Sequence, residues 1–171
     1  MSLEPQTSLD SRFSTPGAEA TPWSDVERLL AEAELFWIAT VRPDGGVHVT
    51  PLGAIWMDNA LYFTTGPREQ KALNLEWSQR CTFTTGANSW SKGFDVVLEG
   101  RARRVDDRGE LGRVASAYRE KYGDFWEFEA TAGGFEHDGV FSLVFRVEPE
   151  TVFGFGKGEL YSQTRYRFSP T

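Results

Sequence analysis

A Thr-Thr-Gly sequence followed by two basic residues indicates a site for an anion. Thr64, Thr65 and Gly66 end the predicted strand "LYFTT" and lead directly into a predicted helix. This arrangement would gather free backbone N–H groups, two hydroxyls and the positive end of a helix dipole. Arg68 and Lys71 fall in the first turn, where cations are disfavoured unless an acid or a bound phosphate compensates them.

Two interpretations of these basic residues remain equally open on the pattern alone. In the first they bind a phosphate, and in the second they are solvated surface residues with Glu69 or Glu76 as neighbours. The helix itself is predicted over "GPREQKALNLEW", with Pro67 near its first position, where a missing N–H costs nothing.

Other residues capable of chemistry do not form a recognised pattern. The two histidines, His48 and His137, and the single Cys81 have no metal-site spacing. His137 and Asp138 are adjacent, which does not suit a catalytic triad, and there is no nucleophile-elbow motif. The "GFGKG" stretch at 154–158 lacks the Ser or Thr and the helix of a phosphate loop.

Composition limits the classes of function. A chain of 171 residues is long enough for one domain with a sizeable core. The net charge of −7, with 25 acidic and 18 basic residues, argues against a general nucleic-acid binder. A lone cysteine excludes an intramolecular disulfide, and no apolar run approaches the ~20 residues of a membrane span. Without a leader pattern, we expect a cytoplasmic protein with no membrane partner.

The N-terminal part is predicted to contain a tail and one helix. Residues 1–22 are rich in Ser, Thr, Pro and Gly and are expected to form a flexible tail, with the folded domain over 23–171. A capping-box pattern formed by Ser24 and Glu27, followed by apolar residues at helical spacing, predicts a helix from about 23 to 34.

The remainder is mostly strand. "LFWIATV" and "VHVTPLGAIWM", joined by "RPDGG", predict a hairpin, and "MDNA" predicts the next turn. Asp107 and Glu110 predict the start of a helix that ends near Gly123. "DFWEFEATAGGFEHDG" indicates an irregular loop, and "VFSLVFRV", "TVFGF" and "RYRF" indicate closing strands. The element order predicts an α+β fold with a closed or partly closed barrel.

The stretch "ATVRPDGGVHVTPLGAIWMDNALYFTTGPREQKALNL" resembles the flavin- or deazaflavin-binding split β-barrel family, the pyridoxamine 5′-phosphate oxidase-like proteins, and especially their actinobacterial branch. Its specific part runs from Ala39 to Asn74, with weaker matches in "FSLVFRV" and "YSQTRYRF". The resemblance implies a split β-barrel of six to eight mostly antiparallel strands with about three flanking helices. It also implies a homodimer with cofactor sites at the interface.

The resemblance further implies FMN or the deazaflavin coenzyme F-420 as the cofactor. The strand from His48 to Pro51 would run beside the ring, and the Thr64 loop with Lys71 would hold the phosphate end. The implied cofactor-binding residues are His48, Val49, Thr50, Pro51, Thr64, Thr65, Gly66, Gln70, Lys71 and Asn74. For His48 a structural role, with a hydrogen bond to a neighbouring strand, competes with ligand contact.

Four residues outside this stretch are placed near the partner's site by the resemblance: Ser89, Trp90, Arg165 and Arg167. The chain departs from the family where Leu73 stands in place of a second Arg that relatives often carry, which puts the affinity for a long anionic tail in doubt. The C-terminus also lacks the Arg-His signature of true pyridoxine-phosphate oxidases, so oxidation of vitamin B6 is disfavoured.

The implied activity is hydride transfer between the cofactor and a small conjugated or aromatic substrate, for which the protein need supply no catalytic dyad. No catalytic side chain is identified. The alternatives are a barrel that stores or carries a flavin, a deazaflavin or haem without turnover, and a barrel that binds an apolar ligand with no cofactor.

Overall fold

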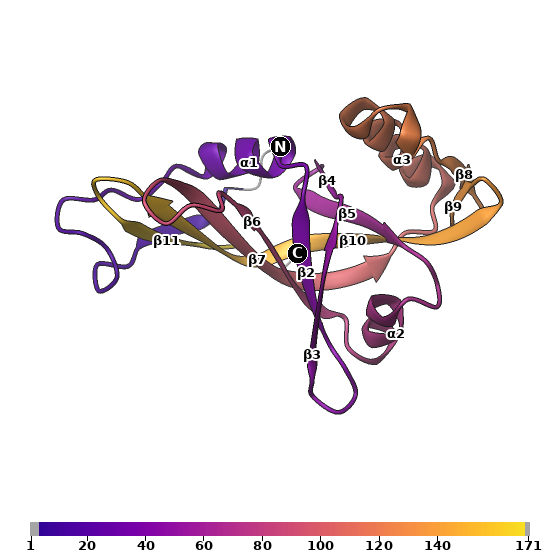
Figure 1. Ribbon diagram of the computed structural model, residues 1–171, viewed down its shortest axis with the longest axis horizontal. Coiled ribbons are helices and arrows are strands. Elements are labelled where there is room, and N and C mark those ends of the chain that lie inside the picture. The colour runs from indigo at the N-terminus through magenta and orange to yellow at the C-terminus, as the bar shows by residue number, and fades with distance from the viewer. Residues whose placement is uncertain (1–3, 170–171) are drawn as a thin grey trace.

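Eleven strands and three α-helices make up the fold in the computed structural model, which describes residues 4–169 (Figure 1). All strand pairings are antiparallel, which confirms the α+β class, although the strands outnumber the six to eight expected. The helices are α1 (Trp23–Glu32), α2 (Gln70–Trp77) and α3 (Arg108–Tyr122), with a 3-10 helix η1 (Asp124–Trp126). The strands are β1 (Gln6–Leu9), β2 (Phe36–Val41), β3 (Val47–Leu52), β4 (Ile55–Met57), β5 (Ala60–Thr65), β6 (Arg80–Gly86), β7 (Gly93–Arg104), β8 (Glu129–Thr131), β9 (Gly134–His137), β10 (Val140–Lys157) and β11 (Ser162–Arg167).

The longest strand, β10, explains why the barrel is split. One edge of β10 pairs with β5 over residues 143–147 and then with β11 over residues 151–156, while β7 lies along its other edge. The partner changes at a bulge after Pro149, a residue that has no N–H to donate to a ladder. Gly100 faces this bulge, and a Cβ there would lie 2.4 Å from the backbone of β10, so the close crossing requires glycine.

The barrel wall runs in the order β4, β5, β10, β7, β6, β2, β3, and within the described residues its two ends, β3 and β4, do not pair. The wall is therefore open on this side. The predicted β2–β3 hairpin is confirmed. The predicted turn before β5 is also confirmed, because Asp58 and Asn59 both have positive φ values (52° and 58°), as a two-residue hairpin turn requires.

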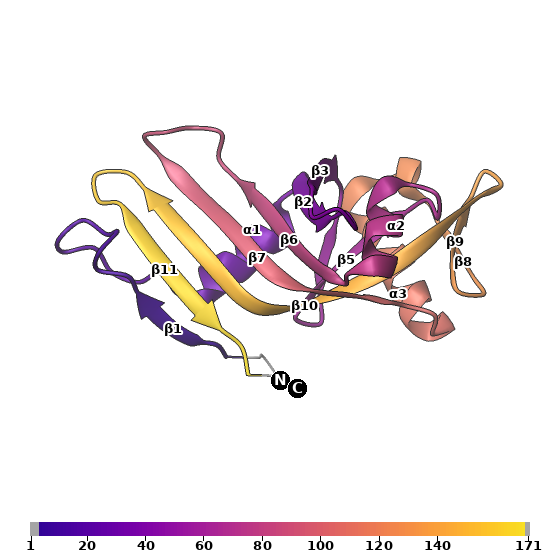
Figure 2. The same cartoon turned by 90° about the horizontal axis from the view of Figure 1, so that it is seen from below.

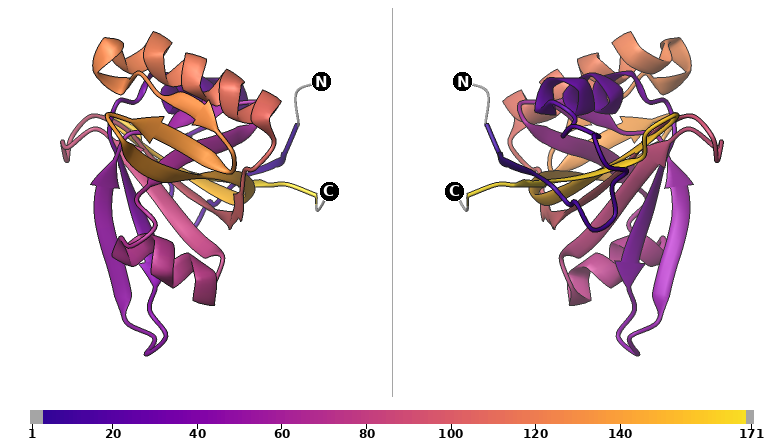
Figure 3. Two further views of the ribbon diagram at one scale, coloured as in Figure 1. Left: turned by 90° about the vertical axis from the view of Figure 1, so that its right-hand side faces the viewer. Right: turned by 90° about the vertical axis from the view of Figure 1, so that its left-hand side faces the viewer.

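The helices cover two different sides of the sheet. Helices α1 and α3 lie on one side, whereas α2 lies on the other, next to the β2–β3 hairpin (Figure 3). The barrel interior is filled by aromatic residues such as Phe36, Phe63 and Phe83. A second core, which includes Tyr62 and Tyr118, lies between α3 and the sheet. The two cores fix the positions of β5 and α3.

The two predicted helix caps differ in outcome. Helix α1 begins at Trp23, as predicted, but the capping box at Ser24 is wrong, because Pro22 is the N-cap and no side chain caps the helix. Burial of Trp23 against Tyr166, with ring centroids 5.2 Å apart, favours this start. The start of α3 is as predicted, because the Asp107 carboxylate accepts a hydrogen bond from the Glu110 N–H at 2.7 Å. Helix α3 ends before Gly123, whose φ is 79°.

Two segments are more regular than their composition indicates. In the expected tail, β1 pairs with β11, and the two strands lie side by side in Figure 2. The Thr15 N–H also donates to the Tyr161 carbonyl at 2.8 Å. The expected irregular loop contains the β8–β9 hairpin, which joins β10. The first segment gains its order from a strand distant in sequence, which composition does not register, whereas in the second segment the consecutive strands β8, β9 and β10 pair with one another. The domain boundary near residue 23 stays a prediction.

Candidate functional site

The four residues implied for the cofactor ring lie on β3, an edge strand whose partner within the described residues is β2. Their side chains alternate: His48 and Thr50 are half-buried, and Val49 and Pro51 are exposed. An edge strand leaves backbone N–H and C=O groups free on its outer side. These groups and Pro51 are accessible to a ligand, because nothing in the sheet covers them.

Two buried polar atoms in the implied set have no hydrogen-bond partner among the described residues. They are Nδ1 of His48 and Oγ1 of Thr64. Buried polar atoms are normally satisfied, so each exception needs an explanation such as a missing ligand or water. For His48, Nδ1 does not make the bond to a neighbouring strand that a structural role would give it.

The loop after β5 differs from the prediction in its length. Helix α2 begins at Gln70 instead of directly after Gly66, and Glu69 is its N-cap. Pro67 therefore lies in a turn and not at the first helical position, and exposed Arg68 lies outside the helix. The turn is closed by a hydrogen bond from the Glu69 N–H to the Gly66 carbonyl at 3.0 Å. This turn places residues 67–69 between the end of β5 and the N-terminal end of the α2 dipole.

Lys71 is buried, with 7% of its surface exposed, and its ammonium group forms an ion pair with the Glu69 carboxylate. The other Glu69 oxygen, Oε1, accepts a hydrogen bond from the Gly66 N–H at 2.8 Å. Burial opposes ionisation of Glu69, but the hydrogen bonds from Lys71 and from the Gly66 N–H outweigh it and lower the Glu69 pKa. The loop thus holds an anion in the form of its own carboxylate. Sequence reasoning named Glu69 only as a possible neighbour.

Asn74 connects the loop region to β2, the strand that pairs with β3. Its fully buried side chain donates from Nδ2 to Oγ1 of Thr40 on β2 at 2.9 Å and accepts from Nε2 of Gln70 at 2.8 Å. Thr40 lies directly opposite His48 in the β2–β3 pairing. The structure therefore brings the two implied groups of residues together, while both polar groups of Asn74 are already occupied within the protein.

Replacing Asn74 with Ala is expected to lower the free energy of unfolding by about 2 kcal/mol, because it leaves the buried Thr40 hydroxyl without its donor. Urea denaturation followed by tryptophan fluorescence measures this change. Glu76→Ala, at an exposed position of the same helix, serves as the control and is expected to stay within about 0.5 kcal/mol of the wild type. Equal losses in the two variants would contradict the role given to Asn74.

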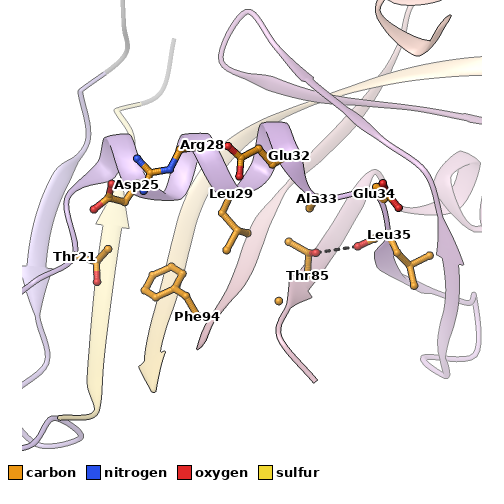
Figure 4. Close-up of a pocket in the computed structure, with 11 residues that line it drawn as sticks. Thr21, Asp25, Arg28, Leu29, Glu32, Ala33, Glu34, Leu35, Thr85 and Phe94 are labelled. Carbon is orange, nitrogen blue, oxygen red and sulfur yellow. Dashed lines mark hydrogen bonds and ion pairs between the residues drawn. The ribbon is translucent and has the colours of Figure 1, made fainter. Parts of the chain in front are cut away.

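Three pockets of the described residues lie away from β3 and α2. A groove of about 660 Å³ beneath α1 has Leu29, Phe94 and Leu35 on its apolar side and Asp25 and Glu32 on its rim (Figure 4). Two further hollows, of about 520 Å³ and about 270 Å³, lie beside the middle of β10 and beside β1 and β11, respectively. None of the three is lined by an implied cofactor residue. A small-molecule site usually buries most of its ligand, so the surface around β3 and α2 needs another wall.

The residues implied for the partner's site lie on two surfaces. Trp90 lies on the β6–β7 loop and is 86% exposed. On the same loop, the Ser89 carbonyl accepts a hydrogen bond from the Lys157 ammonium at 2.6 Å. Arg165 and Arg167 lie on β11. This strand pairs with the C-terminal half of β10, whereas β5 pairs with the N-terminal half. Within one chain, these four residues are not part of the β3–α2 surface.

Nucleophile and metal chemistry find no support in the described residues. Burial raises the pKa of the Cys81 thiol to about 12, so the thiolate is scarce at neutral pH. Residues 4–169 contain no group of three or more His, Cys, Asp or Glu side chains that could hold a metal ion. None of the helices in the same range is long and apolar enough to cross a membrane.

Residues 23–154 match the family model described as pyridoxamine 5′-phosphate oxidase. No curated protein matches the chain. The fold resembles that of an FAD-binding protein from Mesorhizobium loti, with 17% identity, a TM-score of 0.58 and coverage of 95% of this chain and 98% of that one.

Two other solved structures share the fold. A protein described as F420 reductase is 21% identical, with a TM-score of 0.56 and coverage of 74% of this chain and 94% of that one. The haem storage protein HutZ from Vibrio cholerae is 17% identical, with a TM-score of 0.58 and coverage of 74% of this chain and 89% of that one. At these identities the likeness concerns the split-barrel fold.

Proposed function

The chain belongs to the pyridoxamine 5′-phosphate oxidase family, and from this premise we propose that it is an oxidoreductase that uses a flavin or a deazaflavin. The observation that carries the proposal is the anion-holding loop next to the edge strand: Gly66 and Lys71 hold a carboxylate, and Asn74 ties their helix to the strand opposite His48. The proposed reaction is hydride transfer to or from a small conjugated or aromatic substrate.

The residues present fit such a cofactor in chemistry. The Gly66 N–H and the Lys71 ammonium are the kind of donors that bind phosphate oxygens. Nδ1 of His48 and Oγ1 of Thr64 are buried polar atoms with free hydrogen-bonding capacity. We assign the phosphate end to Thr64, Thr65, Gly66, Gln70 and Lys71, with Asn74 as a support, and the ring to His48, Val49, Thr50 and Pro51.

The bound cofactor would supply the hydride chemistry, and the chain supplies binding, orientation and exclusion of water. Pro51 and the free edge of β3 would orient the ring. The β2–β3 pairing and the Asn74 bond to Thr40 hold β3 and α2, the elements proposed to bind the ring and the phosphate, next to each other. This division of roles needs no acid–base dyad in the chain.

We further propose that the site is completed in a homodimer. The β2–β3 hairpin exposes 46% of Trp37, 63% of Val47 and 54% of Val49, and this apolar surface adjoins the open site. A second copy that covers it would supply the missing wall, with Ser89, Trp90, Arg165 and Arg167 as candidates for contacts across the interface. A cytoplasmic location, with either F-420 or FMN as the cofactor, belongs to the same proposal; F-420 is included because of the resemblance to actinobacterial proteins.

A carrier of a flavin, a deazaflavin or haem is the second candidate, favoured by the likeness in fold to a haem storage protein. The visible spectrum of the purified protein, followed by titration with FMN, F-420 and haem, identifies the cofactor. Steady-state oxidation of the reduced cofactor with a panel of quinones and enones then separates the candidates. We expect saturable, substrate-dependent turnover; tight binding without turnover would leave the carrier, and no binding would refute both.

A further inference from the structure

The Glu69 carboxylate occupies the donors that the proposed function gives to a phosphate. Its Oε1 accepts from the Gly66 N–H at 2.8 Å, and its other oxygen pairs with the Lys71 ammonium. An oxygen anion held by a backbone amide and an ammonium group is the usual form of a phosphate site. Here the anion belongs to the chain itself.

We infer that Glu69 is an internal competitor of the cofactor phosphate, which must displace the Glu69 carboxylate to reach Gly66 and Lys71. The inference rests on the proposed function, because it concerns the same loop. It assigns Glu69 a role in selecting the ligand and not in the hydride transfer.

The geometry allows the carboxylate to leave while the donors stay. The Glu69 side chain is 53% exposed, whereas the Lys71 side chain is 8% exposed, so Glu69 can rotate into water and Lys71 remains buried. The start of α2 does not depend on the Glu69 side chain, because the Ala72 N–H bonds to the Glu69 backbone carbonyl at 2.9 Å. Displacement therefore breaks the contacts of the Glu69 carboxylate with Gly66, Lys71 and Thr65 without unwinding the helix.

Competition by a monoanion favours a particular class of ligand. A phosphate monoester carries about −1.5 to −2 charges at pH 7 and offers three acceptor oxygens. It can therefore replace one carboxylate on Lys71 with a net gain in charge pairing. A ligand that ends in a hydroxyl or a carboxylate, or whose phosphate is a singly charged diester as in F-420, has no such advantage. Glu69 would therefore select for a terminal phosphate monoester, which FMN carries.

Removing the charge of Glu69 tests this inference. Glu69→Gln keeps an oxygen that can accept from the Gly66 N–H but leaves Lys71 without its anion. We expect FMN to bind to this variant about tenfold more tightly than to the wild type, since the Lys71 ion pair no longer has to be broken. The affinity for riboflavin, which lacks the phosphate, should stay unchanged. Flavin fluorescence quenching measures both dissociation constants.

Glu76→Gln is the matched control, because it removes the same charge from an exposed position of α2 with no ion pair among the described residues. Equal FMN affinity in the wild type, Glu69→Gln and Glu76→Gln proteins would overturn the inference and leave the proposed function intact. If no variant binds FMN or F-420, the proposed function fails. The inference about Glu69 is then tested with inorganic phosphate as the ligand. At constant ionic strength it should raise the melting temperature of Glu69→Gln more than that of Glu76→Gln; equal shifts would refute competition.

Discussion

Lys71→Ala is expected to weaken the binding of FMN or F-420 by more than tenfold. Under the proposed function, the substitution removes a charge-assisted contact to the cofactor phosphate, worth roughly 1.5–3 kcal/mol, and a factor of ten corresponds to about 1.4 kcal/mol. It also leaves the Glu69 carboxylate without its cation, so a negative charge next to the Gly66 N–H would oppose the phosphate. Titration of the apoprotein with each cofactor measures the loss.

Arg68→Ala provides the control for Lys71→Ala. Arg68 carries the same charge three residues earlier, but it is exposed, lies in the turn before α2, and has no ion pair among the described residues. We expect its removal to change affinity less than threefold, as is typical of a screened surface charge. Equal losses of affinity from the two substitutions would show that only the net charge of the protein matters, and not a specific contact of Lys71. Unchanged cofactor affinity in Lys71→Ala would favour a barrel that binds an apolar ligand without a cofactor.

Combining Lys71→Ala with Glu69→Gln tests whether the effects of the two side chains on ligand affinity are coupled. Residues that share an ion pair are coupled, so the effects of the single substitutions should not add. Once Lys71 is absent, Glu69→Gln should restore less than the tenfold that it gains in the wild type, because no ion pair then has to be broken. Strict additivity would indicate that phosphate does not compete with Glu69 for Lys71.

Local sequence signals predict the turns and the α3 cap well, because each depends on residues within a few positions. Asp58 and Asn59 tolerate the positive φ that a two-residue hairpin needs, and the Asp107 side chain reaches the Glu110 N–H directly. The α+β class also follows from the order of helical and strand-like segments. Such features require no knowledge of distant contacts.

The features that the sequence does not predict depend on contacts between distant residues. Strand β1 exists because β11, near the other end of the chain, pairs with it. At the candidate site, the residue types indicate an anion-binding loop. They do not reveal that α2 starts at Gln70 or that Glu69 turns back onto Gly66. The turn before α2 sets the direction of the Glu69 side chain, and the spacing of residues in the sequence does not reveal this direction.

Phe63→Ala is expected to cause the largest loss of stability, about 3–5 kcal/mol. Phe63 is fully buried; its ring stacks on Phe145 with centroids 5.2 Å apart and lies 5.4 Å from Phe83. It thus joins β5 to β10 and to β6 inside the barrel. Because domains of this size are stable by only about 5–15 kcal/mol, the variant would be close to unfolding at physiological temperature.

The same substitution should affect the candidate site, because Phe63 immediately precedes Thr64 and fixes the end of β5. We expect the folded fraction of Phe63→Ala to bind the cofactor more weakly, whereas Trp77→Ala, at a position 67% exposed, should preserve both stability and affinity. Guanidinium denaturation measures the first quantity and cofactor titration the second. A Phe63→Ala protein with wild-type stability would show that the barrel core does not depend on this aromatic cluster. If it bound the cofactor with wild-type affinity when folded, the phosphate loop would be positioned by α2 and Asn74 instead of β5.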